Sequence, residues 1–231
     1  MIFAANFKMN HTRVSTYNYV HALRDRIVAS QLEHAVYVFP PATALMGSYR
    51  PVTIGAQNAW PQMQGAYTGE IGMEQLGEFG INTLLIGHSE RRTILKETQE
   101  IVAEKYAFFK ERNYEIIYCI GEPIEVREAG DEAVEAYLLE QFEGIDIHYE
   151  RMILAYEPIW AIGTGRSATV EEIVSTHAML RRHIAQPILY GGSVKPANIQ
   201  EIASVENVDG VLVGGASLEV DSFFAMMEKI R

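Results

Sequence analysis

The chain has 231 residues, a length at which α/β barrels commonly form one domain and at which a single globule buries roughly 70 to 75% of its unfolded surface. Its 30 Asp and Glu residues outnumber 19 Lys and Arg, and the formal net charge of −11 excludes general binding to nucleic acid or to an anionic membrane. The single cysteine, Cys119, excludes an intrachain disulfide framework. The sequence shows neither the basic and apolar pattern of a signal peptide nor an apolar run of about 18 residues that could span a membrane. We therefore expect a soluble, cytoplasmic protein.

Short apolar runs, many of them rich in β-branched residues, recur along the chain. Their composition is typical of parallel strands that are buried on both faces. The expected strands are the eight runs at residues 2–5, 35–39, 52–56, 83–86, 115–119, 152–156, 187–190 and 208–213.

Segments with helical spacing of apolar residues lie between most of these runs, including residues 93–111, 125–142, 170–183 and a shorter segment at 218–230. Eight strands that alternate with helices favour a closed (β/α)8 barrel, the TIM barrel, although an open, doubly wound sheet shares much of the pattern. No linker, charge block or change of composition marks a second domain. We therefore expect residues 1–231 to form a single barrel domain.

Polar or glycine-rich groups directly follow most of the expected strands. Asn6 and Lys8 follow the first strand, His88 the fourth and Glu157 the sixth, while glycine pairs follow the last two. If all the strands are parallel, these groups lie on one rim, which is where (β/α)8 barrels carry their active sites.

The two glycine pairs stand in YGGSV (190–194) and VGGASL (213–218). Such pairs let backbone N–H groups approach an anion closely, and Ser193 adds a hydroxyl donor near Gly214 and Gly215. The same glycines could instead serve only tight turns between strand and helix. Two pairs on adjacent strands, where barrels often bind phosphate, favour a phosphate site.

Glu157 is the first polar residue after the run 152–156, and the loop behind it carries Trp160 and two isoleucines before the sequence Gly-Thr-Gly. A carboxylate beneath an apolar lid is suited to abstract a proton next to a carbonyl, because the lid expels water and raises the basicity of the carboxylate. The alternative is a carboxylate paired with a lysine or arginine on the rim.

His88 precedes a segment that resembles the start of a helix, where a neutral imidazole that donates a hydrogen bond is expected. Lys8 and Asn6 are candidates to stabilise negative charge on a reacting oxygen, while a solvated loop lysine and a Schiff-base nucleophile remain alternatives for Lys8. The other six histidines show no spacing typical of metal ligands, and we expect them on the surface: His11, His21, His34, His148, His177 and His183.

Three charged residues follow His88, namely Glu90, Arg91 and Arg92. We expect them to form a salt-bridge network that fixes their loop rather than to act chemically. Cys119 ends the fifth expected strand without an obvious His or Lys partner in the sequence, so we expect a buried structural thiol.

The loop that runs from Gln57 to Glu70 contains Trp60, Met63 and Tyr67. On a monomer these side chains would form an exposed apolar patch, so burial against a partner subunit is attractive. A loop folded onto its own barrel explains the same residues equally well.

Eight motifs, each at a strand end or in the loop behind it, make the whole chain similar to the triosephosphate isomerase family. In order they are NFKMN (6–10), GAQN (55–58), GAYTGEIG (65–72), GHSERR (87–92), CIGE (119–122), AYEPIWAIGTG (155–165), YGGSV (190–194) and LVGGASL (212–218). Phe7, Lys96 and Arg166 depart from the usual pattern of that family, and none of the three replaces a catalytic group.

The resemblance implies interconversion of dihydroxyacetone phosphate and D-glyceraldehyde 3-phosphate through an enediolate, in glycolysis and gluconeogenesis, without a metal or an organic cofactor. It assigns proton transfer to Glu157, polarisation of the carbonyl to His88 and stabilisation of the developing charge to Lys8 and Asn6, with Glu90 in support. A glutamate base, a neutral histidine and a closing loop are the established scheme of this family.

The resemblance also assigns the phosphate to Gly163, Ser193, Gly214 and Gly215, and it implies a homodimer in which loop 57–70 brings Thr68 close to the partner's active site. Three alternatives to this function stay open. They are a Schiff-base aldolase, a metal-dependent sugar-phosphate epimerase, and a protein that binds the phosphate without turnover.

Overall fold

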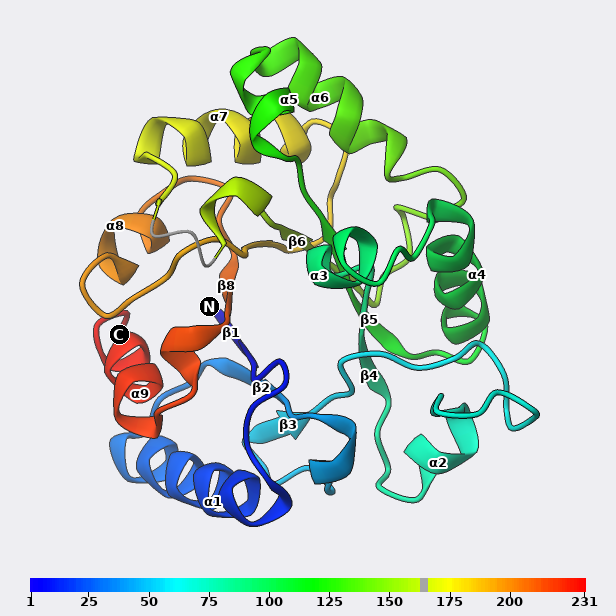
Figure 1. Ribbon diagram of the computed structural model, residues 1–231. Coiled ribbons are helices and arrows are strands. Elements are labelled where there is room, and N and C mark those ends of the chain that lie inside the picture. Colours follow the sequence, from blue (N-terminus) through cyan, green and yellow to red (C-terminus); the bar gives the residue numbers. More distant parts are fainter. Residues whose placement is uncertain (163–165) are drawn as a thin grey trace.

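The computed structural model describes residues 1–162 and 166–231, in which eight parallel strands are surrounded by helices (Figure 1). The strands follow one another in space in the order β3-β2-β1-β8-β7-β6-β5-β4. At the two ends of this sheet, the Ala56 N–H donates to Thr83 O at 3.0 Å and the Leu85 N–H donates to Ala56 O at 2.9 Å. The sheet thus curls into a nearly closed barrel, and the predicted (β/α)8 fold is confirmed.

The strands overlap all eight expected runs, because each run is apolar on both faces and the fold buries both faces. One face of the sheet lines the inside of the barrel, and the other packs against the helices. The strands are β1 Ile2–Asn6, β2 Ala35–Phe39, β3 Val52–Ile54, β4 Thr83–Ile86, β5 Glu115–Ile120, β6 Met152–Tyr156, β7 Ile188–Tyr190 and β8 Gly210–Val213.

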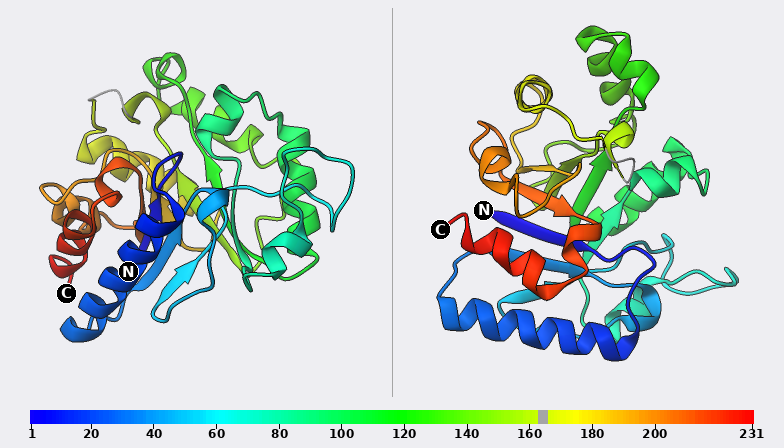
Figure 2. Two further views of the ribbon diagram at one scale, coloured as in Figure 1. Left: turned by 60° about the horizontal axis from the view of Figure 1, so that its bottom comes forward. Right: turned by 60° about the vertical axis from the view of Figure 1, so that its left-hand side comes forward.

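Helices connect most of the strands and cover the outside of the barrel (Figures 1 and 2). The α-helices are α1 Arg13–Ser30, α2 Met73–Gly77, α3 Ser89–Thr93, α4 Gln99–Lys110, α5 Ile124–Glu128, α6 Asp131–Glu140, α7 Val170–Arg181, α8 Ile199–Ala203 and α9 Val220–Glu228. Among residues 1–162 and 166–231 there are also the short 3-10 helices η1 Ala42–Ala44, η2 Ile159–Ala161 and η3 Gly215–Ser217. No helix within the described parts of the chain has the length and hydropathy that a membrane span requires.

Two of the expected helices differ from those observed. The segment 93–111 forms a helix only from Gln99, because Lys96 has a positive φ of 60° and Thr98 caps the new helix start by accepting the Ile101 N–H. The segment 125–142 is divided into α5 and α6 at Gly130, whose φ of 101° an ordinary helix cannot include. Helical spacing of apolar residues alone did not reveal either interruption.

The interior of the barrel is filled by a small apolar cluster separate from the larger core between strands and helices. Cys119 belongs to this inner cluster and is fully buried, so the expected structural thiol is confirmed. The buried members of the cluster are Ala4, Phe39, Leu85, Ile117, Cys119, Ile153, Ala155, Leu189 and Leu212. This packed layer closes the barrel below the rim, so a ligand can enter only from above it.

The expectation of a surface position is wrong for His177. Its side chain is completely buried, on the face of α7 that Ile173 and Leu180 also occupy, one helical turn away on either side. Its ring lies 5.8 Å from that of Tyr156 and 6.3 Å from that of Tyr190, measured between centroids. The helical phase of residue 177, and not the polarity of its neighbours in sequence, decides its position.

Candidate active site

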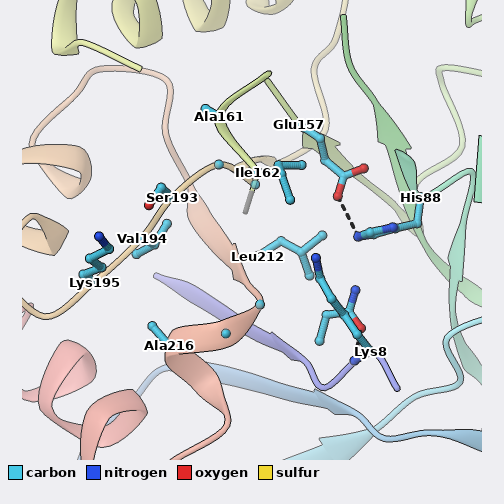
Figure 3. A pocket seen from close by; sticks show the side chains of 15 residues that line it. Lys8, His88, Glu157, Ala161, Ile162, Ser193, Val194, Lys195, Leu212 and Ala216 are labelled. Atoms are coloured by element: carbon cyan, nitrogen blue, oxygen red, sulfur yellow. Dashed lines mark hydrogen bonds and ion pairs between the residues drawn. The ribbon is translucent and has the colours of Figure 1, made fainter. Parts of the chain in front are cut away.

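A cavity of about 360 Å³ opens at the carboxyl ends of the strands (Figure 3). Its lining includes Asn6 and Lys8 from the end of β1 and the loop behind it, His88 after β4 and Glu157 after β6. The glycine-rich turns after β7 and β8 complete the wall. The groups that the sequence placed on one rim therefore line a single cavity.

The backbone of Glu157 is held tightly between neighbouring strand ends. Its N–H donates to Ile120 O at 2.7 Å. A Cβ added to Gly121 would lie only 1.9 Å from Glu157 O, and one added to Gly191 would lie 3.0 Å from Glu157 Cγ. Glycine at both positions leaves room for the main chain and the side chain of Glu157. The close packing around them fixes the position of the Glu157 backbone, which carries the carboxylate.

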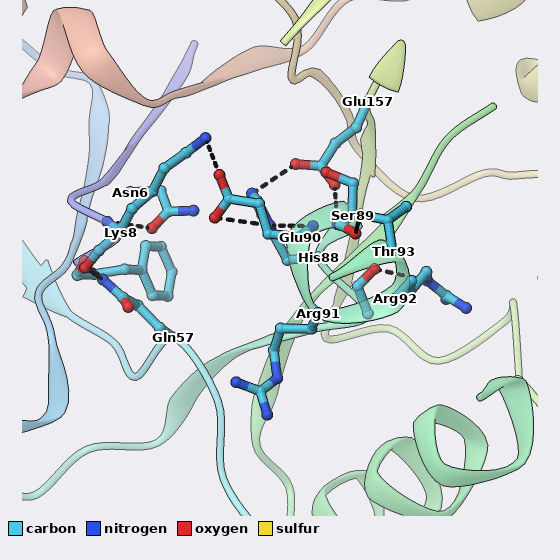
Figure 4. A network of polar contacts seen from close by, with 12 residues as sticks. Asn6, Lys8, Gln57, His88, Ser89, Glu90, Arg91, Arg92, Thr93 and Glu157 are labelled. Atoms are coloured by element: carbon cyan, nitrogen blue, oxygen red, sulfur yellow. Dashed lines mark hydrogen bonds and ion pairs between the residues drawn. The ribbon is translucent and has the colours of Figure 1, made fainter. Parts of the chain in front are cut away.

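The carboxylate of Glu157 contacts two groups of the opposite wall (Figure 4). Its Oε2 accepts the Ser89 N–H at 2.8 Å, and its Oε1 lies 2.9 Å from His88 Nε2. His88 is also the N-cap of α3, and its Nδ1 accepts the Glu90 N–H at 3.2 Å. An Nδ1 that accepts leaves the proton on Nε2, the atom that faces the cavity and Glu157.

The two buried side chains shift each other's pKa. Burial raises the pKa of Glu157, but the charge and hydrogen bond of His88 and the Ser89 N–H together lower it further, to a net value below the usual range. Burial lowers the pKa of His88, but the carboxylate of Glu157 outweighs burial and the net pKa is raised. The expected increase in basicity of Glu157 is therefore not found in this arrangement, and for His88 the shift is opposite to the one expected from a helix start.

The lowered pKa of Glu157 has a chemical consequence. Its carboxylate is ionised and ready to accept a proton, but it is also occupied by the Ser89 N–H and by His88. Loss of the bond to Ser89 would remove a stabilising donor and make the carboxylate more basic.

Lys8 extends from the loop after β1 toward the same wall. Its N–H donates to Asn6 Oδ1 at 2.9 Å, and the Gln57 side-chain amide donates to Lys8 O at 2.8 Å. Its Nζ lies 2.6 Å from Glu90 Oε1, and Glu90 Oε2 lies 3.8 Å from His88 Nδ1. Glu90 thus lies between the lysine and the histidine (Figure 4).

The two arginines after Glu90 have structural contacts, as expected. Arg91 Nε donates to Glu97 Oε1 at 2.6 Å, while Arg92 Nε donates to Gly87 O at 2.7 Å. The expected salt-bridge network is thus present only in part: Arg91 pairs with Glu97 and Glu90 pairs with Lys8, whereas Arg92 donates to neutral groups.

The turns after β7 and β8 form a glycine-rich cradle on the other side of the cavity. A Cβ on Gly215 would meet no atom within 4 Å, and one on Gly214 would meet only the Lys8 side chain, with Cε at 3.1 Å. The backbone there is open to a ligand, beside Ser193. Gly163, the fourth predicted phosphate residue, lies outside the described residues. Within the described residues, no group of three or more His, Cys, Asp or Glu side chains could hold a metal ion.

Sequence reasoning missed a buried network around Glu122. Glu122 is fully buried, and its Oε1 accepts hydrogen bonds from Tyr156 Oη at 3.0 Å, from Trp160 Nε1 at 3.0 Å and from Arg127 Nη2 at 2.8 Å. The network ties β6 and the start of the loop after Glu157 to the end of β5. The position of Glu122 directly after a strand was the only signal in the sequence, and nothing there indicated its partners.

Fold and site together define a class: a (β/α)8-barrel protein with a carboxylate and an imidazole facing each other beside a glycine-rich cradle. A sequence profile of the triosephosphate isomerase family matches residues 1–230. The triosephosphate isomerase of a Sulfurovum species is 64% identical over 98% of this chain and 99% of its own, and that of Wolinella succinogenes is 53% identical over 100% of both. That of a Nitratiruptor species is 52% identical over 99% of this chain and 97% of its own.

The chain therefore belongs to the triosephosphate isomerase family. This family catalyses the interconversion of dihydroxyacetone phosphate and glyceraldehyde 3-phosphate in glycolysis, so the chain is an isomerase, as its motifs predicted.

Proposed function

We propose that residues 1–231 act as one catalytic domain in which Glu157 and His88 move protons on a triose phosphate held by the glycine-rich cradle. The observation that carries this proposal is the distance of 2.9 Å between Glu157 Oε1 and His88 Nε2 in the wall of the cavity that the cradle lines. A base and a proton donor this close can act on two adjacent atoms of one small substrate.

Isomerisation needs one proton to move between two carbons and one between two oxygens. Glu157 takes a proton from C1 of dihydroxyacetone phosphate, the C–H electron pair forms the C1=C2 bond, and the carbonyl electron pair moves onto O2. His88 Nε2–H donates to O2 and takes the proton from O1, so the aldehyde forms at C1 while Glu157 returns its proton to C2. The substrate and the product have the same atoms and charge, and the enzyme ends in its starting state.

The remaining polar residues stabilise charge. The ammonium of Lys8 and the amide of Asn6 face the oxygen that becomes negative in the enediolate, and Glu90 holds Lys8 in place through its contact of 2.6 Å. The backbone N–H groups of Gly163, Gly214 and Gly215, with Ser193, hold the phosphate. Ile162 lines the cavity and helps to exclude water from the intermediate.

Exchange of substrate hydrogen with solvent tests the role of Glu157. Incubated with dihydroxyacetone phosphate in deuterated water, the protein should incorporate deuterium at C1, and Glu157→Gln should reduce the rate at least about a thousandfold, which corresponds to ~4 kcal/mol in the barrier. Glu172→Gln, on the outer helix α7, is a matched control that should exchange normally. Unchanged exchange in Glu157→Gln would exclude Glu157 as the base.

The same samples test the other enzyme classes. Reduction with borohydride should trap no substrate on Lys8, whereas an aldolase that forms a Schiff base would be trapped. A chelator should leave the exchange rate unchanged, whereas a metal-dependent epimerase would lose activity.

We further infer that the protein is a homodimer of the cytosol that serves glycolysis and gluconeogenesis, with loop 57–70 as its main contact. The loop extends away from the barrel in Figure 1 and in both views of Figure 2. Met63 and Tyr67 are about 40% exposed, at 41% and 43%, and the Tyr67 ring lies 5.0 Å from that of Trp60. Apolar side chains on an extended loop support burial against a second copy, with Thr68 near the partner's site.

Sedimentation of a charged variant tests the dimer. Tyr67→Glu should dissociate it, because the new carboxylate would be buried without a partner at the interface. Tyr137→Glu, at a tyrosine of similar exposure on α6, should sediment as the unaltered protein does. A dimer that persists in Tyr67→Glu, or an unaltered protein that is monomeric, would exclude this interface.

A further inference from the structure

A second lysine, Lys195, lines the cavity in addition to Lys8. It lies two residues after Ser193, in the turn between β7 and α8. Figure 3 shows it on the side of the cavity with Ser193, away from Glu157 and His88. Neither its position in the sequence nor the proposed proton transfers give it a role.

The turn that carries Lys195 is held by Asn198. The Lys195 N–H donates to Asn198 Oδ1 at 2.7 Å, and Asn198 Nδ2 donates to Ser193 O at 3.0 Å. The N–H groups of Asn198 and Ile199 both donate to Lys195 O at 3.1 Å. One asparagine therefore fixes both the backbone at Ser193, which is part of the cradle, and the residue that presents the second lysine.

The charges around the cavity make this lysine significant. Lys8 is paired with Glu90 at 2.6 Å, and Glu157 adds a second carboxylate at the reaction centre. The ammonium of Lys195 forms no ion pair with any carboxylate in the described parts of the chain. Lys195 is exposed at the mouth of the cavity, so its charge can act on an incoming anion.

The substrate meets an unfavourable field before it reaches the site. A phosphate monoester carries a charge of about −1.5 to −2 at neutral pH. The protein has a formal net charge of −11, so its average field repels such a ligand. A local cation at the entrance opposes this repulsion at the point where the phosphate must arrive.

We propose that Lys195 is a second cation of the phosphate region that attracts the dianionic triose phosphate and strengthens its binding, without taking part in proton transfer. This inference rests on the proposed function for its substrate, but the binding site it describes is one for a phosphate dianion in general. Because the ammonium is exposed, its effect acts through the Coulomb field and depends strongly on ionic strength.

The test compares variants at low and high salt. At low ionic strength Lys195→Gln should reduce kcat/KM about fivefold, which is the order of magnitude of the attraction between a dianion and one nearby exposed positive charge in water. The value of kcat should not change. Lys195→Glu should reduce it by roughly the square of that factor, and Lys195→Arg should retain it. In about 1 M NaCl, where the Debye length is about 3 Å, all of these differences should disappear.

Lys110→Gln is the matched control, because it removes the same charge at the far end of α4, close to Asp146 and away from the cavity. It should leave kcat/KM unchanged at both salt concentrations. Titration with inorganic phosphate, followed by calorimetry, provides a readout that needs no turnover. Lys195→Gln should weaken phosphate binding at low salt by about the same factor as kcat/KM, and unchanged phosphate binding would overturn the proposal.

The outcomes separate this proposal from a structural role and from the proposed reaction. A loss of kcat/KM that persists at high salt, or a reduced kcat, would show that Lys195 shapes the turn and would overturn the proposal. Equal behaviour of Lys195→Gln and Lys110→Gln at low salt would overturn it as well. If Glu157→Gln kept its exchange activity while phosphate binding still depended on Lys195, the proposed reaction would fail and this inference would stand.

Discussion

Protonation of His177 should destabilise the fold in mildly acidic solution. Burial lowers the pKa of this imidazole from 6.5 to about 4, against weaker raising effects from the Asn207 carbonyl and Asp209. Arg181 adds to the lowering, and the rings of Tyr156 and Tyr190 surround the side chain. Nδ1 is 3.0 Å from Asn207 O, so it carries the proton of the neutral ring, while Nε2 has no partner among the described residues.

The sign and size of the effect follow from the two pKa values. Between pH 6.5 and about pH 4 the unfolded chain binds a proton at this residue and the folded chain does not, so the free energy of unfolding falls as the pH falls. Above pH 6.5 both states are neutral and the group contributes no pH dependence. The shift corresponds to about 3 kcal/mol in full, of which about 2 kcal/mol should already be lost at pH 5.

Urea unfolding followed by tryptophan fluorescence, at one protein concentration, measures this loss. His177→Gln removes the titrating group and retains an amide donor for Asn207 O. Between pH 7.5 and pH 5 the free energy of unfolding should fall in both proteins, but by about 2 kcal/mol less in His177→Gln than in the unaltered protein. His148→Gln, at an exposed histidine, is the control and should follow the unaltered protein. Equal losses in His177→Gln and the unaltered protein would refute the assignment to His177.

Two further substitutions have clear expectations. Gly121→Ala should reduce kcat at least about tenfold and lower the stability, because its Cβ would lie 1.9 Å from Glu157 O and must displace the base; a kinetic assay with normal activity would contradict this. Lys105→Met should cost about 3 kcal/mol in urea unfolding, because it removes a buried ammonium 2.5 Å from Glu97 Oε1. Lys105→Met with the stability of the unaltered protein would show that this charge pair does not stabilise the fold.

Much of the site could be predicted because one rule governs it. Parallel strands in a barrel end on the same rim, so Glu157 and His88, each directly after an apolar run, had to lie on the same side of the molecule. The contact of Glu157 with the Ser89 N–H could not be predicted. The two residues are 68 positions apart, and the direction of that N–H depends on how the chain turns after β4. The pKa of Glu157 is lowered mainly by the charge and hydrogen bond of His88, to which the Ser89 N–H adds, and this lowering was missed as well.

Buried polar groups that do not line the cavity were the other source of error. Glu122 directly follows a strand, yet its carboxylate does not line the cavity and instead accepts hydrogen bonds from Arg127 and Trp160. His177 lies within a helix whose inward face was not distinguished from its outward face. In both cases the partners come from other elements of the fold, and their identities are not encoded in local spacing.

The pairing of the first strand with the last has a consequence for synthesis on the ribosome. Residues 2–5 of β1 stand opposite residues 210–213 of β8, with a Cβ on Gly210 only 2.4 Å from Ile2 O. One edge of β1 therefore stays unpaired until almost the entire chain has left the exit tunnel, and an unpaired apolar edge invites aggregation. We expect nascent chains stalled before residue 210 to be protease-sensitive and to bind chaperones, and chains stalled with β8 fully outside the tunnel to resist proteolysis. If both nascent chains resisted equally, the barrel would not need its last strand in order to fold.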